Sequence, residues 1–222
     1  MVDVIMPAWN KFELTKRAIQ SIRDSTTVSY RLIMIDNGCT DGTAAWLAEQ
    51  DDIKRVITFE ENRGFAPAIN AGLAVCTSPY VVMFSNDVEV DTGWLKLLIE
   101  GLESDPKIGA IGPLSTAKID RQWEGYHRAM SGVQTVPYWL ALFCTLLRAK
   151  AIQDVGELDE RFAPAYGEDN DYLYRMRLAG WDSAVHCDVL ARHDHSTITP
   201  EQEGLRAVAR QRLREKWPNG PF

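Results

Sequence analysis

The sequence predicts an α/β fold: an open, mostly parallel twisted sheet flanked by helices, with a smaller mixed portion in its second half. Short apolar runs alternate with segments of helical periodicity, which is typical of parallel strands joined by helical crossovers. The length of 222 residues suits one generous domain, and 45% hydrophobic with 25% charged residues is ordinary globular usage. We therefore expect a single domain over 1–222, comprising a first half (1–113), a second half (114–199) and a C-terminal helix (200–222).

Each element is predicted from its local pattern. Apolar runs of strand length predict strands at residues 2–6, 31–35, 55–59, 80–84, 108–111 and 139–147, and alternation of two different faces predicts one at 181–189. Apolar residues three and four apart predict helices at residues 12–24, 43–50, 67–76, 94–102, 169–179 and 199–217. Pro67 suits a first helical turn, Thr92 is a candidate N-cap, and Thr199 with Gln202 forms a capping box. Residues 115–135 carry few signals and are predicted as a variable loop or short strands.

Charge and cysteine content narrow the functional class. Lys plus Arg number 24 and Asp plus Glu 31, a net charge of −7, so no nucleic-acid partner is expected. The N-terminus lacks a secretory pattern, and the longest apolar run, residues 137–147, is too short to cross a bilayer. Four cysteines without a C-x-x-C pair suit reduced, mostly buried thiols. These features predict a cytoplasmic chain.

Four polar clusters directly follow predicted strands: Asn10, Asp36-Asn37, Asn62-Arg63-Gly64 and Ser85-Asn86-Asp87. Because the carboxyl ends of parallel strands share one rim, we expect these clusters to converge. The Asp36 carboxylate could accept a hydrogen bond from a base, or belong to an Asx-rich turn. Asp87 could hold a hard divalent cation that also binds ligand phosphates, or end a polar turn. The third cluster could hold an anion at a helix N-terminus.

Two further clusters lie in the second half. Glu168, Asp169 and Asp171 stand at a helix start, where one carboxylate suffices for capping. Crowded carboxylates raise one another's pKa, which favours a general base in this cluster. His193 and His195 follow the last strand and are either ligands for a manganese-type cation or exposed loop residues.

The motifs together resemble the family 2 glycosyltransferases, enzymes of the GT-A fold that move a sugar from a nucleotide donor to an acceptor hydroxyl. No G-x-G-x-x-G, P-loop or G-x-S-x-G pattern competes with this resemblance. Seven segments carry it in the family's order: residues 5–10, 36–43, 62–72, 84–90, 156–162, 167–175 and 193–197. The turn at 36–43 reads D-N-G-C-T-D-G-T, close to the family's D-N-x-S-x-D-G-T.

The resemblance implies a role for each matched residue. Asp87 and His193 would hold a divalent cation, Mn²⁺ or Mg²⁺, on the donor diphosphate. Asp169 would be the catalytic base, with Glu168 and Asp171 placing the base or the acceptor. Asp36 would bind the nucleobase within a wider set of donor contacts: Pro7, Ala8, Asn10, Asp36, Asn37, Asn62, Arg63, Gly64, Asn70, Ser85 and Asn86.

These roles predict an inverting transfer from a UDP-sugar, or from a dTDP-sugar such as dTDP-rhamnose. The acceptor would be a hydroxyl of a glycan, a lipid-linked sugar or a small molecule. Ser85 replaces the first Asp of the family's DxD motif, so Asp87 carries more of the metal binding. A nucleotidyltransferase is disfavoured because residues 6–10 lack a Gly-rich loop, and a non-catalytic sugar-binding module because the Glu168–Asp169 pair is intact.

The C-terminal helix carries mixed charges with a basic side. A weak contact with a membrane surface is one interpretation, since family members often act on lipid-linked acceptors. A helix packed on the core with a solvated basic face is favoured, because the apolar stripe is narrow.

Overall fold

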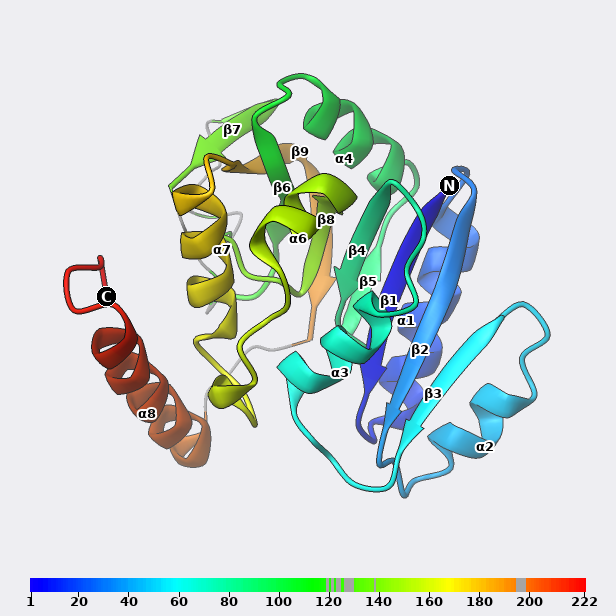
Figure 1. Cartoon of the computed structure of the whole chain (residues 1–222). Helices are drawn as coiled ribbons and strands as arrows, with labels where there is room; N and C mark the ends of the chain where they lie inside the picture. Colours follow the sequence, from blue (N-terminus) through cyan, green and yellow to red (C-terminus); the bar gives the residue numbers. More distant parts are fainter. Residues whose placement is uncertain (119, 121, 123–124, 126–129, 138, 195–198) are drawn as a thin grey trace.

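The computed structural model describes residues 1–118, 120, 122, 125, 130–137, 139–194 and 199–222. Its strands form a nine-stranded sheet in the order β3-β2-β1-β4-β8-β6-β9-β5, with β7 paired to β9 (Figure 1). The strands are β1 (Val2–Ala8), β2 (Tyr30–Asn37), β3 (Arg55–Phe59), β4 (Tyr80–Phe84), β5 (Val88–Val90), β6 (Ile108–Ser115), β7 (Val133–Val136), β8 (Cys144–Arg148) and β9 (Asp182–His193). The helices are α1 (Phe12–Ser25), α2 (Thr43–Ala48), α3 (Phe65–Leu73), α4 (Trp94–Glu103), α6 (Ala149–Val155), η1 (Glu160–Phe162), α7 (Glu168–Leu178) and α8 (Pro200–Lys216).

The pairing confirms a mostly parallel sheet. Strand β1 pairs in parallel with β2 and β4, and β2 with β3. Strand β8 is antiparallel to both β4 and β6, which lets β6 and β9 run in the same direction as the first four strands. Strands β5 and β7 are antiparallel to β9. The mixed portion therefore lies on the second-half side, as the sequence predicts.

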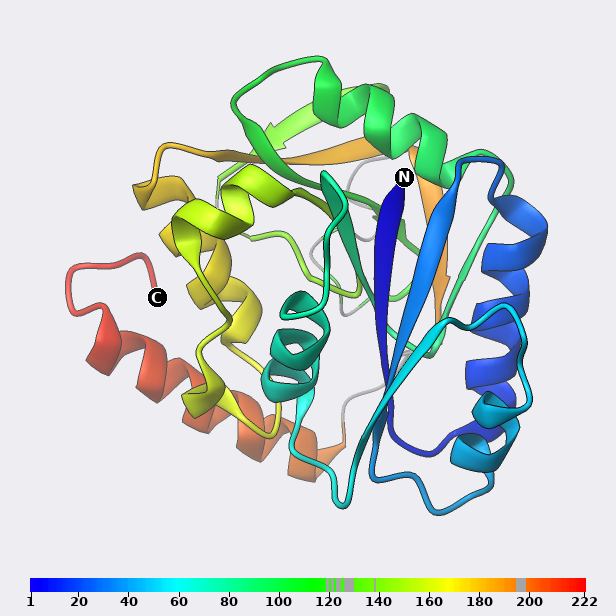
Figure 2. The same cartoon turned by 45° about the vertical axis from the view of Figure 1, so that its right-hand side comes forward.

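Two hydrophobic layers cover the sheet. Every residue of β1 is buried, as expected for a central strand covered on both faces. Val4 and Met6 belong to the layer that includes α1 and α4, whereas Ile5 belongs to the layer with α3, α6 and α7. Figures 1 and 2 show these two sets of helices on opposite faces of the sheet. Among the described helices, none combines the length and apolarity needed to cross a bilayer.

The expectation of a strand over residues 139–147 is only partly right, because β8 begins at Cys144. Residues 139–143 form a loop instead, and the Ala141 amide donates to Oε1 of Gln122 at 2.6 Å. The apolar side chains of this run have another role, since Trp139 and Phe143 line a cavity. Strand β5 and helix α6 were not expected. Thr92 does not cap α4, whose N-cap is Gly93 with φ +87°.

Asp3 is a fully buried carboxylate near the start of β1, an interior strand of the sheet. It accepts two hydrogen bonds from Arg31 at 2.9 Å, and others from the amides of Thr77 and Ser78 at 2.8 and 3.0 Å. Burial alone would raise its pKa, but these donors outweigh burial and hold the pKa below the usual value.

We expect Asp3→Asn to lower the free energy of unfolding at pH 7 by about 2–4 kcal/mol, because a charge-assisted hydrogen-bond set is lost. A carboxyl with a lowered pKa stabilises the fold above its unfolded pKa, and this contribution is lost as the pH falls through its folded pKa. The difference in the free energy of unfolding between parent and variant should therefore become smaller at acidic pH. Urea unfolding at pH 7 and pH 3.5 checks this, with exposed Asp51→Asn as the control. Equal stabilities at pH 7 would contradict the assignment.

Candidate active site

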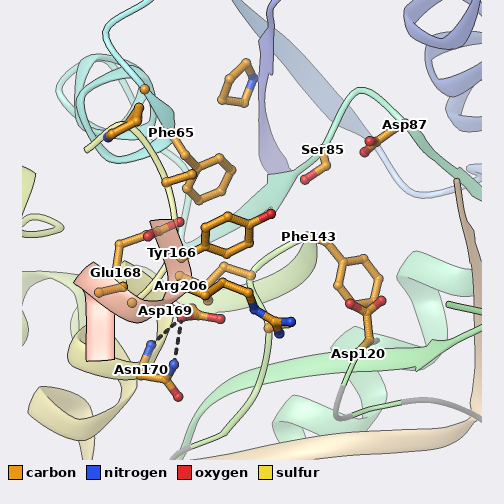
Figure 3. Close-up of a pocket in the computed structure, with 18 of the residues that line it drawn as sticks. Phe65, Ser85, Asp87, Asp120, Phe143, Tyr166, Glu168, Asp169, Asn170 and Arg206 are labelled. Atoms are coloured by element: carbon orange, nitrogen blue, oxygen red, sulfur yellow. Dashed lines mark hydrogen bonds between the residues drawn. The ribbon is translucent and has the colours of Figure 1, made fainter. Parts of the chain in front are cut away.

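A cavity of about 480 Å³ opens where β1 and β4 end, and loop 163–167, α7 and α8 form its other side (Figure 3). It gathers side chains from segments far apart in the sequence. Ten of the residues predicted from the sequence line it: Pro7, Asn37, Asn62, Gly64, Ser85, Asn86, Asp87, Glu168, Asp169 and His193.

The four polar clusters converge on one rim through hydrogen bonds between their loops. The Asn10 side chain accepts from the amide of Thr40 at 2.8 Å, and its carbonyl oxygen accepts from Nδ2 of Asn86 at 3.3 Å. Asn37 donates from Nδ2 to Oδ1 of Asn62 at 2.9 Å. The loops after β1, β2, β3 and β4 therefore form one connected surface, as the strand-end rule predicts.

Six predicted site residues lie outside the cavity lining: Ala8, Asn10, Asp36, Arg63, Asn70 and Asp171. Asp36 is 2% exposed and accepts from the Cys39 amide at 2.9 Å, so its carboxylate fixes the turn after β2. Asn70 is buried and exchanges two hydrogen bonds of 2.9 Å with the backbone of Leu158. These side chains hold the backbone behind the site.

Gly64 brings the loop before α3 against the loop before α7. Its φ is +92°, and a Cβ at this position would lie 2.6 Å from the carbonyl oxygen of Pro164. The Phe65 amide donates to that same oxygen at 3.2 Å. Tyr166, in the opposing loop, has a φ of +75°, a conformation that non-glycine residues rarely adopt. The two walls of the cavity are thus fixed to each other by backbone contacts.

Asp87 stands between two cationic groups at the end of β4. Lys11 donates from Nζ to Oδ2 at 3.1 Å, and Nε2 of His193 lies 3.5 Å from Oδ1. Burial opposes ionisation, but the hydrogen bonds and charges of these partners prevail and lower the pKa of Asp87 to about 2. Asn10 and Lys11 both have left-handed backbone, with φ of 55° and 58°, and this turn places Lys11 beside the carboxylate.

His193 has a second carboxylate partner that the sequence did not indicate. Its Nδ1 lies 2.8 Å from Oδ2 of Asp120, and its ring stacks on Phe143 with the centroids 4.7 Å apart. Burial acts to lower the pKa of His193, but Asp120 and Asp87 raise it to about 9. Asp120 lies in the 115–135 region, where no pattern pointed to it.

The ligand set at Asp87 is partial, and it fits a cation that takes its remaining ligands from water and substrate. In the part of the chain that the structure describes, no three His, Cys, Asp or Glu residues are grouped to hold a metal ion. Asp87 offers carboxylate oxygens, and His193 would offer an imidazole nitrogen once a cation displaces its proton; both line the cavity. Mg²⁺ and Mn²⁺ suit such a partial set, because they keep waters and take substrate phosphates as ligands. Residues 195–197 of the predicted segment 193–197 lie outside the described residues, so His195 is not placed.

Asp169 and Glu168 begin α7 on the opposite wall. Oδ1 of Asp169 accepts from the amide and Nδ2 of Asn170 at 2.7 and 3.2 Å, and its carboxylate lies beside Tyr166 and Arg206 (Figure 3). Glu168 is 8% exposed, and its Oε2 has no hydrogen-bond partner among the described residues. Burial first, and then the charge of Asp169, raise the pKa of Glu168 to about 8. Burial, more than the expected crowding of carboxylates, thus keeps a proton on Glu168.

The structure does not bring Asp171 into the cavity. Residues two apart lie on different sides of a helix, so Asp171 and Asp169 point in different directions. The Asp171 carboxylate is fully buried and binds Nε of Arg175 at 2.9 Å, Nε1 of Trp217 at 2.8 Å and Nζ of Lys216 at 2.6 Å. It attaches α8 to α7.

Sequence reasoning missed most of the aromatic and basic lining. Trp9 lies at the cavity and is 55% exposed, and Tyr166 projects into it (Figure 3). Helix α8 contributes Arg206 and Arg210 to the same lining. The position of Trp9 within the P-x-x-N segment was a usable signal. No sequence signal pointed to the α8 arginines, because the residue pattern of a surface helix does not show which part of the protein it covers.

The family model described as "Glycosyl transferase family 2" matches residues 3–161. The chain belongs to glycosyl transferase family 2. Its GT-A-type sheet and the cavity at the strand ends agree with that membership.

Two curated relatives of this family 2 chain come from Mycobacterium tuberculosis. Pre-mycofactocin glycosyltransferase is 29% identical over 215 residues, which cover 88% of this chain and 43% of the relative. N-acetylglucosaminyl-diphospho-decaprenol L-rhamnosyltransferase is 25% identical over 224 residues, which cover 82% of this chain and 73% of that protein. The chain thus spans less than half the length of the first relative.

A solved structure of GalNAc-T7 with UDP, GalNAc and Mn²⁺ shares the fold of this family 2 chain. The TM-score is 0.78 at 13% identity, over 99% of this chain and 48% of that one. At this identity, the likeness shows the fold alone.

The raised pKa of Glu168 predicts a pH-dependent stability of this family 2 chain. Between the unfolded pKa of about 4.5 and the folded pKa of about 8, the native state binds more protons than the unfolded state. The free energy of unfolding therefore falls as the pH rises through this window. Glu168→Gln cannot ionise, so relative to the parent it should gain about 2–4 kcal/mol between pH 5 and pH 8. Chemical denaturation across this range checks it, with exposed Glu201→Gln as the control. Parallel profiles of the parent and Glu168→Gln would contradict the assignment.

Proposed function

We propose that this chain is an inverting glycosyltransferase that moves a sugar from a nucleoside-diphosphate sugar to an acceptor hydroxyl. The supporting observation is that one cavity holds Asp87 on one wall and Asp169 on the facing wall. The family membership and the sugar transfer in the relatives' names favour the same class of reaction.

The donor nucleotide is proposed to lie over the ends of β1 and β2. Pro7, Asn37 and Asn62 line this part of the cavity. The Asn37 side chain already bonds to the Asn62 side chain and to the backbone of the two residues after it, so the exposed Asn62 side chain would be the amide that meets base or ribose groups. UDP is the first candidate, because the GalNAc-T7 structure with the same fold holds UDP. A dTDP-sugar is the second, since one relative is named as an L-rhamnosyltransferase. Asp36, behind this wall, would act by holding the turn.

Asp87 and His193 would hold a divalent cation against the donor diphosphate. When bound, such a cation neutralises the charge that grows on the departing nucleoside diphosphate. Ser85 and Asn86 line the same wall, and Asn86 is fixed by a 2.9 Å hydrogen bond to Oγ1 of Thr15. The chain's own contribution is a rigid carboxylate with a pKa low enough to stay ionised at every physiological pH.

Asp169 would be the general base. It takes the proton of the acceptor hydroxyl as the acceptor oxygen bonds to the anomeric carbon and the bond from that carbon to the diphosphate oxygen breaks. A single base is enough for such a displacement, and the configuration at the anomeric carbon is inverted. Glu168, protonated near pH 7, can donate a hydrogen bond to the acceptor, while the neighbouring carboxylate of Asp169 accepts one.

The proposal is tested by offering UDP-, dTDP- and GDP-sugars with and without Mn²⁺. We expect one nucleotide series to raise the melting temperature in the presence of Mn²⁺, because a ligand that binds only the native state stabilises it. The same sugar nucleotide should then release its nucleoside diphosphate slowly in the presence of the cation. Release of pyrophosphate would identify a nucleotidyltransferase instead, and binding without release of either product would identify a non-catalytic module.

A further inference from the structure

Four of the five basic residues of α8 fall into two groups, of which the first attaches the helix to the protein. Nζ of Lys216 binds Asp159 at 2.7 Å and Asp171 at 2.6 Å. Arg212 donates from Nη1 to the backbone carbonyl of Ala163 at 3.1 Å. These contacts account for the charges on the side of α8 that faces α7 and η1.

The second group, Arg206 and Arg210, faces the cavity instead. Residues four apart lie on one side of a helix, and Ala209 and Leu213, buried between and beyond them, line the cavity as well. The side chains of Arg206 and Arg210 are 33% and 53% exposed, so both guanidinium groups remain accessible to a ligand.

The two guanidinium groups share one carboxylate within the described residues. Glu203 lies 2.9 Å from Nη2 of Arg210 and 3.9 Å from Nη1 of Arg206. The Asp169 carboxylate also lies beside Arg206 (Figure 3), so an anion would bind here through the N–H groups that the guanidinium groups present to the cavity, and not through an excess of positive charge. The Arg206 guanidinium also lies over the Tyr166 ring, 5.6 Å from its centroid, which fixes its direction.

Arg206 lies on the wall of the proposed base, and not on that of the proposed cation. Figure 3 shows it beside Asp169 and Tyr166, across the cavity from Ser85 and Asp87. An anion held here would therefore belong to the acceptor, while the donor diphosphate lies near Asp87. A guanidinium group donates two parallel hydrogen bonds, and a phosphate has enough oxygens for two such groups at once.

We propose that Arg206 and Arg210 bind a phosphate group carried by the acceptor, so that the acceptor is a sugar phosphate or a sugar linked to a lipid through a diphosphate. This inference rests on the proposed function, because it takes the acceptor to lie at Asp169. The two sources share the same phosphate chemistry, and the experiment separates them.

The test measures binding of matched sugars by titration calorimetry in the presence of UDP and Mn²⁺. Glucose and N-acetylglucosamine are each offered as the 1-phosphate and as the methyl glycoside. The parent protein should bind a 1-phosphate about 10- to 100-fold more tightly than its methyl glycoside, as expected for charge-assisted hydrogen bonds. The double variant Arg206→Gln/Arg210→Gln should lose this preference. Arg214→Gln is the matched control, because Arg214 is exposed on the same helix and outside the cavity lining.

A second variant acts in the opposite direction. Glu203→Gln removes the carboxylate that competes for both guanidinium groups, so the phosphate preference should rise a few-fold. A farnesyl diphosphate derivative of N-acetylglucosamine is titrated in parallel. Tighter arginine-dependent binding of this derivative than of the 1-phosphate supports a lipid-linked acceptor, and equal binding supports a free sugar phosphate.

Three results would overturn the inference. The first is the absence of a phosphate preference in the parent protein for either sugar, including the absence of all binding. The second is an equal loss in Arg214→Gln. The third is a loss of UDP affinity in the double variant as large as its loss of phosphate preference, which would assign the arginines to the donor. Failure of the proposed function is distinct, because no sugar nucleotide would then release its nucleoside diphosphate even in the parent protein.

Discussion

Replacing Asp169 by Asn should lower the turnover of sugar transfer by about 10²–10⁴-fold, the usual contribution of a positioned general base. Asn has the same shape but cannot take up the proton of the acceptor hydroxyl. The chemical step should therefore become slower, while donor affinity should stay unchanged. Initial rates at saturating donor and acceptor, together with a UDP titration, measure the two effects separately. The melting temperature should stay close to that of the parent, because the Asp169 side chain is part-exposed and bonds locally to Asn170.

Asp51→Asn is the control for this change, since Asp51 is an exposed carboxylate outside the cavity lining. A pH–rate profile adds a second readout, because the loss in Asp169→Asn should be largest at pH values where the parent base is ionised. Retention of more than about a tenth of the parental turnover would rule out Asp169 as the base.

Replacing Asp87 by Ala should abolish most of the stimulation by Mn²⁺. A bound cation is worth several kcal/mol to a departing diphosphate, so turnover should fall by about 10²–10³-fold. Mn²⁺ dependence of nucleoside diphosphate release measures the effect, and chelation of the metal in the parent protein should reproduce it. Binding of Mn²⁺ with UDP, followed by calorimetry, gives a readout that does not depend on turnover.

Asp91→Ala is the matched control for the Asp87 variant. Asp91 also pairs with a cation, Arg192 at 2.8 Å, but its side chain is 61% exposed and lies outside the cavity lining. Its removal should leave the Mn²⁺ dependence intact. Metal-stimulated release that persists in Asp87→Ala would contradict the proposed cation site.

The first half of the fold is predictable from the sequence because its signals are local. Buried parallel strands such as β1 and β4 appear as continuous apolar runs, and polar residues after them mark the rim of the sheet. This logic predicts that Asn37 and Asp87 lie at one rim of the sheet, and both line the cavity there. The family resemblance added Asp169, whose local pattern alone also fits a helix cap.

The second half is less predictable from the sequence, because the contacts that form its part of the site join residues far apart in the chain. The pairing of His193 with Asp120 joins residues 73 apart, and no periodicity records such a contact. The run at 139–143 is apolar because it walls the cavity, and an apolar run is the same signal that a buried strand gives. For Asp171 the helical spacing was itself informative, since a residue two positions from Asp169 cannot share its face.

The attachment of α8 has a consequence for how this enzyme family could diversify. The contacts that anchor the helix, from Asp171 to Lys216 and Trp217, lie at its C-terminal end, whereas Arg206 and Arg210 lie further toward its N-terminus. Substitutions on the cavity side can therefore change which molecule is recognised without loosening the scaffold. A library restricted to those two positions would sample new specificities at little risk to folding.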